Sequence, residues 1–191
     1  MSENLKDRAP GALDTVRAFV NTLHLPSTEV EARVEDLDGP HKLREWLGQH
    51  GLPVPERVTA RDLQNAIDVR EALRWLLRAN AGEEPSPEAA RILSEAAERA
   101  RLSLRFAADG SSRLEPRSSG VDGALGALLG TVAAAMADGT WSRLKACRAD
   151  NCHWAFYDHT RNRSGVWCDM AVCGNRAKVR AYRHRHAGEP A

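Results

Sequence analysis

The sequence predicts an α+β fold: a mainly helical amino-terminal domain with one β-hairpin, followed by a small carboxy-terminal module. Three observations lead to this prediction. Four segments with apolar residues at helical spacing precede residue 101, the segment 102–115 alternates instead, and all four cysteines lie within residues 147–173. We expect the amino-terminal domain to span residues 1–140 and to fold independently of the module, which spans 141–191.

The first two predicted helices are short. GALDTVRAFVNTLHL, about residues 10–24, has apolar residues at helical spacing. The acidic stretch that follows it, STEVEARVEDLDGP, predicts only a connection. HKLREWLGQHG is expected to form a helix that buries Trp46 and ends at Gly51, because glycine is the usual residue just beyond a helix.

The next two predicted helices have clear start signals. In TARDLQNAIDVREALRWLLRANAG, Thr59 is a favourable N-cap and Asp62 follows three residues later. In SPEAARILSEAAERARL, Ser86 is the N-cap and Pro87 occupies the first helical position. Trp75, on an apolar face of the third helix, is expected in the core.

The pattern then changes to alternation. LSLRFAADGSSRLEPRSSG places Leu102, Leu104 and Phe106 on one face, and its DG pair indicates a turn before a return strand through Leu114. We therefore expect a β-hairpin. VDGALGALLGTVAAAMADG then predicts a helix of small and apolar residues that ends at Gly139.

Length and composition are typical of a soluble globular protein. The chain has 191 residues, of which 42% are hydrophobic and 28% charged. Its start lacks the apolar run of a signal peptide, and no window approaches the roughly 18 apolar residues of a membrane span. We expect a cytoplasmic protein without membrane contact, in which thiols stay reduced.

The net charge of +1 conceals a division along the chain. Residues 141–191 contain ten Lys and Arg against four Asp and Glu, whereas residues 1–140 contain 17 against 22. The module is therefore basic and the preceding domain acidic. This division favours a polyanionic partner for the module, with a merely solvated basic surface as the alternative.

The cysteines form two pairs of identical spacing. Cys147 and Cys152 are separated by four residues, as are Cys168 and Cys173, and fifteen residues lie between the pairs. Such pairs can converge on one Zn²⁺ as a closed tetrahedral thiolate site, which leaves no open position for a catalytic water. Iron or an iron–sulfur cluster also takes four thiolates, and disulfides would need an oxidising compartment. Ligand type and spacing favour zinc.

The segment CGNRAKVRAYRHRHAG predicts a helix that begins at the metal. Its basic residues are Arg176, Lys178, Arg180, Arg183 and Arg185. Three of them, Arg176, Arg180 and Arg183, share one face, where they can reach phosphates or base edges in a groove. Another face, formed by Val179, Tyr182 and His186, is expected to pack on the rest of the module.

These residues also carry a resemblance to a known family. The segment from Cys147 to Arg185 resembles the CGNR zinc finger, whose tetrapeptide is Cys173–Arg176 here. FVNT (Phe19–Thr22) and LREWL (Leu43–Leu47) resemble the ABATE domain, which accompanies this finger in bacteria. The resemblance implies a treble-clef-like finger in a stress-related transcription regulator, with the finger contacting DNA and the amino-terminal domain sensing a ligand or partner. Where the family often has a basic residue before the Trp-Cys pair, this chain has Gly165 and Val166.

Three classes of function follow from these features. The charge division, the metal module and the arginine face favour a regulator that binds duplex DNA. The alternative is a zinc-stapled module for protein contacts or RNA binding. We do not expect an enzyme, because the sequence has no Ser/His/Asp or Cys/His arrangement, no phosphate-binding glycine loop and no HExxH motif.

Two further predictions concern ligands and assembly. Asn21 and Thr22, which follow the apolar Phe19, are candidates to line a small-molecule pocket, although the end of the first helix explains them equally well. The effector itself is not identified by any motif. A homodimer is expected to help DNA binding, because a single finger with one short helix buries little surface.

Overall fold

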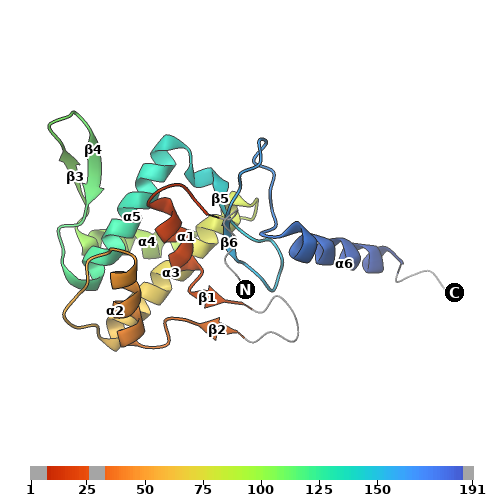
Figure 1. Cartoon of the computed structure of the whole chain (residues 1–191), viewed down its shortest axis with the longest axis horizontal. Coiled ribbons are helices and arrows are strands. Elements are labelled where there is room, and N and C mark those ends of the chain that lie inside the picture. Colours follow the sequence, from red (N-terminus) through yellow and green to blue (C-terminus); the bar gives the residue numbers. More distant parts are fainter. Residues whose placement is uncertain (1–7, 26–32, 187–191) are drawn as a thin grey trace.

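The computed structural model describes residues 8–25 and 33–186, and for His184 and Arg185 the backbone alone. It has the predicted α+β architecture (Figure 1). The helices that precede the cysteine module are α1 (Leu13–Val20), α2 (Pro40–Gln49), α3 (Ala60–Asn80), α4 (Pro87–Ala100) and α5 (Gly120–Asp138). All five predicted helical segments are therefore helical.

The strands form three separate antiparallel pairs. These are β1 (Leu23–His24) with β2 (Val34–Glu35), β3 (Ser103–Phe106) with β4 (Ser112–Glu115), and β5 (Leu144–Ala146) with β6 (Ala155–Tyr157). The pair β3–β4 is the predicted hairpin, with Leu104 opposite Leu114. The other two pairs were not predicted, because strands of two or three residues are too short to show alternation.

Local sequence signals set the helix ends. Thr59 and Asp62 form the predicted capping box: the Asp62 amide donates to Thr59 Oγ1 at 3.2 Å and the Thr59 amide donates to Asp62 Oδ2 at 2.8 Å. Ser86 caps α4 by accepting from the Ala89 amide at 3.2 Å. The first helix ends at Val20 rather than near 24, because Asn21 leaves the helix and the chain enters β1.

Helix α5 lies in the core against α1, α3 and α4 (Figure 1). An 18-residue window of this 19-residue helix has a mean hydropathy of 1.5, so by length and composition α5 could cross a membrane, contrary to the sequence expectation. Half of that window is buried inside the protein. Its glycines permit close packing: a Cβ at Gly126 would lie 2.5 Å from Ala100 Cβ, and one at Gly130 would lie 2.7 Å from the Leu114 carbonyl oxygen. We therefore describe α5 as a core helix.

The cysteine module shares this core. It begins with a 3₁₀ turn, η2 (Trp141–Arg143), and ends with a π-helical turn, η3 (Met170–Gly174), and helix α6 (Asn175–His186). The core residues that it supplies to the same cluster as α1, α3 and α5 are Trp141, Leu144, Ala146, Ala155 and Tyr157. The boundary at residue 140 stays a prediction, but apolar packing crosses it.

Some apolar side chains remain on the surface. Trp75 is 41% exposed, with the Arg78 guanidinium 4.0 Å from its ring centre, so the prediction that it lies in the core is wrong. The buried face of α3 is formed by other residues, such as Val69 and Leu73, and Trp75 lies outside that face. On the hairpin, Leu104 and Phe106 are also exposed.

Candidate metal centre

Two turns bring the cysteines together. In the first, the Cys147 amide donates to the Trp154 carbonyl and the Cys152 amide donates to the Ala149 carbonyl, each at 2.9 Å. These bonds fold residues 147–154 into a tight loop between β5 and β6. The Arg148 amide donates to the Val166 carbonyl at 3.0 Å, which joins this loop to the segment that carries the second pair.

The second turn is η3, which contains Cys173. Asp169 caps it: Oδ1 accepts from the Ala171 amide at 2.6 Å and from the Val172 amide at 3.1 Å. The Gly174 amide donates to the Asp169 carbonyl at 3.0 Å. Helix α6 then continues directly from η3, so its position is fixed by the same cysteine turn.

The four sulfur atoms fit a single tetrahedral metal ion. All four Sγ atoms lie within 4.8 Å of one another, with Cys152 to Cys168 at 3.6 Å and Cys168 to Cys173 at 3.8 Å. A tetrahedron with metal–sulfur bonds of about 2.3 Å has edges of about 3.8 Å. The separations are too long for disulfides, in which the sulfurs are about 2.05 Å apart. A cluster of several iron and sulfide atoms would need a wider cage.

The close thiols also influence one another's protonation. A hydrogen bond from Cys152 is the main cause that lowers the pKa of Cys147. The hydrogen bond with Cys147 is in turn the main cause that raises the pKa of Cys168. Thiolates this close repel one another, so full deprotonation needs a bound metal ion to offset the charge.

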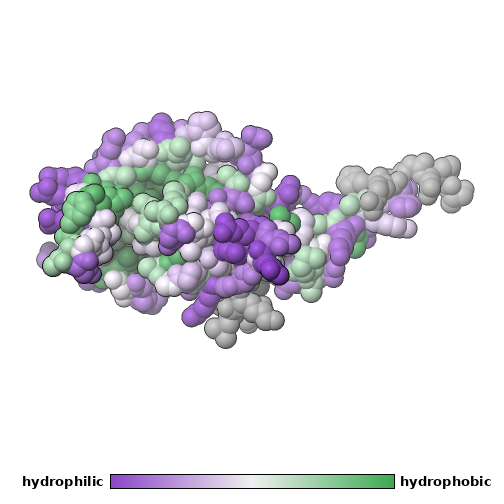
Figure 2. Space-filling model, turned by 90° about the horizontal axis from the view of Figure 1, so that it is seen from above, coloured by the Kyte–Doolittle hydropathy of each residue, from purple (hydrophilic) through white to green (hydrophobic). Residues whose placement is uncertain are grey.

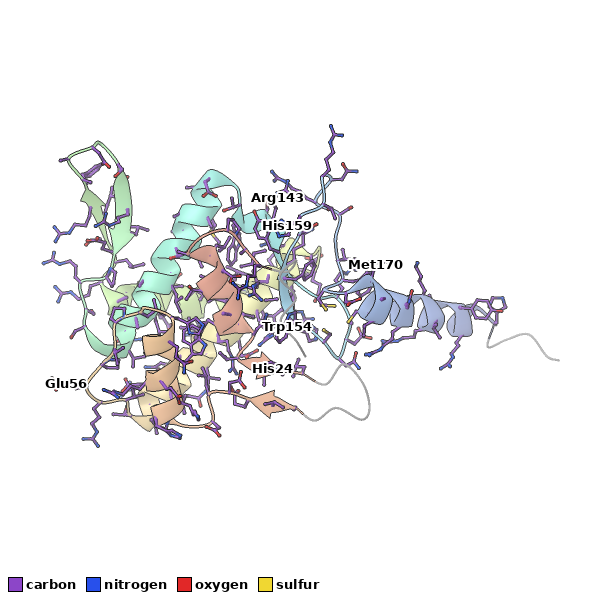
Figure 3. The ribbon with its side chains drawn as sticks, viewed as in Figure 1. His24, Glu56, Arg143, Trp154, His159 and Met170 are labelled. Atoms are coloured by element: carbon purple, nitrogen blue, oxygen red, sulfur yellow. The ribbon has the colours of Figure 1, made fainter. Side chains whose placement is uncertain are left out.

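Aromatic side chains enclose the cysteine cluster. Trp154 and Phe156 are buried with it, and Trp167 is partly buried against it. Trp141 instead lies in the main core. Trp154 and Trp167 thus cover the cysteine cluster, and Trp141 joins the module to the body. Figure 3 shows Trp154 beside His24, whose ring centre is 4.9 Å from that of Trp154.

Comparison with protein families now identifies both parts. A model of the CGNR zinc finger matches residues 143–186. The ABATE model, described as "Putative stress-induced transcription regulator", matches residues 13–139. The chain belongs to the ABATE family. No curated protein matches the chain. The two families together indicate a regulator that carries a metal-binding CGNR finger.

Helix α6 of the CGNR finger carries the predicted basic residues. Lys178 and Arg183 are exposed, Arg176 is half-buried, and Arg180 forms an ion pair with Asp150 on the first cysteine loop. The side chain of Arg185 lies outside the described residues. The contact of these residues with nucleic acid stays a prediction.

The face of α6 formed by Val179, Tyr182 and His186 differs from the prediction. Val179 and Tyr182 are 49% and 58% exposed, and His186 is exposed and stacks on Tyr182 with ring centres 4.1 Å apart. The expectation that this face packs on the module is therefore wrong. Figure 1 gives the physical reason: α6 extends away from the rest of the molecule, so no other helix or strand within residues 8–25 and 33–186 lies beside it.

Asn21 and Thr22, the candidate ligand contacts of the ABATE domain, are buried and bonded internally. Asn21 pairs with the backbone of β6: Nδ2 donates to the Ala155 carbonyl at 2.9 Å and Oδ1 accepts from the Ala155 amide at 2.7 Å. Thr22 Oγ1 donates to the Phe19 carbonyl at 2.8 Å and accepts from Arg70 at 3.1 Å. Their role in ligand binding stays a prediction, while Asn21 joins the end of α1 to the finger and Thr22 joins it to α3.

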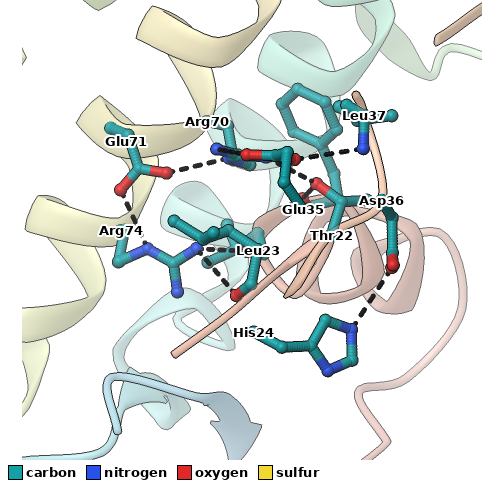
Figure 4. Close-up of polar contacts among 11 residues, drawn as sticks. Thr22, Leu23, His24, Glu35, Asp36, Leu37, Arg70, Glu71 and Arg74 are labelled. Carbon is teal, nitrogen blue, oxygen red and sulfur yellow. Dashed lines mark hydrogen bonds and ion pairs between the residues drawn. The ribbon is translucent and has the colours of Figure 1, made fainter. Parts of the chain in front are cut away.

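Two buried arginines of α3 complete this junction (Figure 4). Arg70 donates two hydrogen bonds to the Glu35 carboxylate, at 2.6 and 2.8 Å. Arg74 donates to the Val20 carbonyl at 2.6 Å and to the His153 carbonyl, next to Cys152, at 3.0 Å. The sequence did not lead us to predict that Arg70 and Arg74 are buried. A signal was present, because the two arginines lie four residues apart within the apolar stripe of α3, where a buried arginine needs polar partners.

The Glu35–Arg70 pair predicts a pH-dependent stability. Burial by itself raises the pKa of Glu35, but the hydrogen bonds and charge of Arg70 outweigh it and hold the pKa below the ordinary value of 4.5. A depressed pKa contributes stability that is present above pH 4.5 and is lost as the pH falls below it. Glu35→Gln should cost about 2 kcal/mol in the free energy of unfolding at pH 7, because it removes the carboxylate that accepts two hydrogen bonds from Arg70, while the Glu71 carboxylate and the Thr22 hydroxyl remain as partners.

Denaturant unfolding at several pH values measures this prediction. The difference between wild type and Glu35→Gln should shrink as the pH falls below 4.5. Glu45→Gln is the matched control, since Glu45 makes an exposed pair with Lys42 and should change little. A difference that is constant between pH 7 and pH 3 would contradict the assignment.

Proposed function

We propose that this chain is a zinc-dependent transcription regulator that binds duplex DNA through helix α6 of its CGNR finger. The cysteine cage supports zinc, because four thiolates in a closed tetrahedral arrangement are typical of structural zinc sites. Bound zinc would hold the two cysteine turns together. Since α6 begins at the second turn, the metal would also fix the direction of the helix.

The protrusion of α6 is the observation that carries this proposal. A helix of 12 residues is marginal in water unless another surface packs against it. Lys178, Arg180 and Arg183 make one side of the exposed helix strongly basic, which favours an anionic surface against that side. A second α6 would repel it. The phosphate backbone of DNA supplies the required negative charge.

Salt dependence tests this assignment. Lys and Arg residues that neutralise phosphates release counterions, so log affinity falls with log salt concentration by about 0.9 for each phosphate contact. The double variant Arg180→Ala/Arg183→Ala should reduce the magnitude of this slope by about 2 and leave metal content and Tm unchanged. Electrophoretic or anisotropy titrations of a duplex between 50 and 200 mM salt, concentrations at which this effect is large, provide the measurement.

The alternative is a finger that contacts protein or single-stranded RNA. If the double variant keeps the affinity and slope of the unsubstituted protein for duplex DNA, α6 is a solvated helix and this alternative is favoured. Arg91→Ala/Arg99→Ala on α4 is the matched control, because it removes the same charge at a distance from the finger.

We also propose that the ABATE domain senses a ligand or partner and transmits the signal to the finger. The contacts between residues 20–24 and residues 153–155 support this proposal. Asn21 pairs with Ala155, the ring of His24 contacts Trp154, and Arg74 bridges Val20 and His153. A displacement of β1 would therefore act directly on the loop that carries Cys152.

A further inference from the structure

The loop between the cysteine pairs is held by a buried ion pair that the metal site does not use. Lys145 on β5 and Asp158 after β6 are 3% and 2% exposed, and Lys145 Nζ donates to Asp158 Oδ2 at 2.8 Å. The ammonium group also donates to the Arg163 and Gly165 carbonyls, at 2.6 and 3.0 Å. All three donors of the lysine are thus engaged in closing this loop.

Asp158 organises the other side of the loop. Its carboxylate accepts from the Thr160 amide and hydroxyl, at 2.9 and 2.7 Å, and from the Gly165 amide at 2.8 Å. Arg143 adds hydrogen bonds from Nη1 to the Asp158 and Thr160 carbonyls. A Cβ at Gly165 would lie 2.9 Å from the Asp158 carboxyl group, so this position favours glycine.

The tip of the loop is exposed and basic. Arg161, Asn162 and Arg163 are all exposed. Arg163 donates to Ser142 Oγ at 3.1 Å, whereas Arg161 has no ion pair or hydrogen bond within residues 8–25 and 33–186. Figure 2, which looks down on this loop, shows a strongly hydrophilic patch at its position between the body and α6. The buried ion pair therefore fixes a loop whose charged end faces solvent.

An open groove separates the loop from the start of α6. It has a volume of about 430 Å³ and is lined by Val166, Trp167 and Met170 on its apolar side and by Ser164 on the loop side. Figure 3 places Met170 at the base of α6, and Figure 1 shows the loop and α6 leaving the same region in different directions. The groove thus lies between the basic loop and η3, the turn from which the basic helix α6 continues.

We propose that loop 159–164 is a second phosphate-contacting element for the duplex DNA bound by α6, with Arg161 as its main contact and the DNA backbone crossing the groove. This inference rests on the proposed function. A buried ion pair is weak evidence for stability, since its desolvation offsets much of its attraction. A loop fixed in one conformation, however, loses less conformational entropy when it binds, and this preorganisation strengthens binding.

The test compares three arginine variants of the full, metal-loaded protein on one duplex. Arg161→Ala should reduce the salt slope by about 0.9 and weaken binding several-fold at 150 mM salt, with Tm and metal content unchanged. Arg161→Lys should restore the slope, because it retains the charge. Arg105→Ala, on the exposed hairpin strand β3, removes the same charge and should leave the slope unchanged.

The outcomes separate this proposal from the assignment of α6. If the Arg180→Ala/Arg183→Ala variant loses slope but Arg161→Ala does not, the loop proposal is wrong and the α6 assignment stands. If Arg161→Ala lowers Tm or metal content in proportion to affinity, the loop is structural and the proposal is likewise wrong. If the unsubstituted protein shows no salt-dependent duplex binding, both proposals are overturned.

Discussion

Cys168→Ser should remove the metal from the protein and unfold the outer half of the finger. The metal is expected to fall from about one ion per chain to near zero, because three thiolates leave the tetrahedral shell incomplete. Zinc binding contributes about 10–16 kcal/mol of folding free energy in small zinc modules, far more than the few apolar contacts of this cluster. Helix α6 depends on the same turn, so it should melt with the site.

Atomic absorption and far-ultraviolet circular dichroism measure these changes. We expect loss of metal, loss of the helical signal of α6 and loss of salt-dependent DNA binding, while the core around α3 and α5 keeps a cooperative transition. Val172→Ser is the control, because Val172 lies in the same turn but points to solvent. A Cys168→Ser protein that retains a full equivalent of zinc would exclude the four-cysteine site.

The sequence predicted the elements whose signals are local. Capping residues and helical periodicity identified α3 and α4, since the Thr59 and Ser86 caps act within one helical turn. The cysteine spacing also identified the metal site, because two short turns can converge without help from distant residues. The ends of α1 were less predictable, since β1 and the pairing of Asn21 with β6 determine where it stops.

Features that depend on distant partners were missed. Arg70 and Arg74 are buried because Glu35 and the carbonyl of Val20 lie opposite them; their position in the apolar stripe of α3 indicates that they need buried partners but not which residues supply them. The exposure of Tyr182 was also missed, because an apolar stripe on a helix does not show whether another element covers it. Both errors concern which surfaces meet, a property of the tertiary fold.

The shared core reverses the expectation that residues 1–140 fold independently and leads to the last prediction: a chain that ends at Gly139 should not fold cooperatively. It lacks the apolar side chains of Trp141, Leu144 and Tyr157, all buried against the amino-terminal helices. At about 2 kcal/mol for each side chain, their loss costs about 6 kcal/mol. Asn21 and Arg74 also lose the carbonyls of Ala155 and His153, at about 1–3 kcal/mol each. Together these losses approach the 5–15 kcal/mol that stabilises a typical domain.

A second truncation, after Gly165, distinguishes the contribution of the core from that of the metal. This longer chain retains the pair β5–β6, the hydrogen bonds from Asn80 to the Trp141 and Leu144 carbonyls, and the Lys145–Asp158 ion pair, but lacks Cys168 and Cys173. It should show one cooperative thermal transition without bound zinc, whereas the chain ending at Gly139 should show a broad one. Cooperative melting of both chains would mean that the ABATE helices form a complete core and that the finger only docks on it. Because packing and hydrogen bonds both cross residue 140, we expect the finger to be part of the same folding unit.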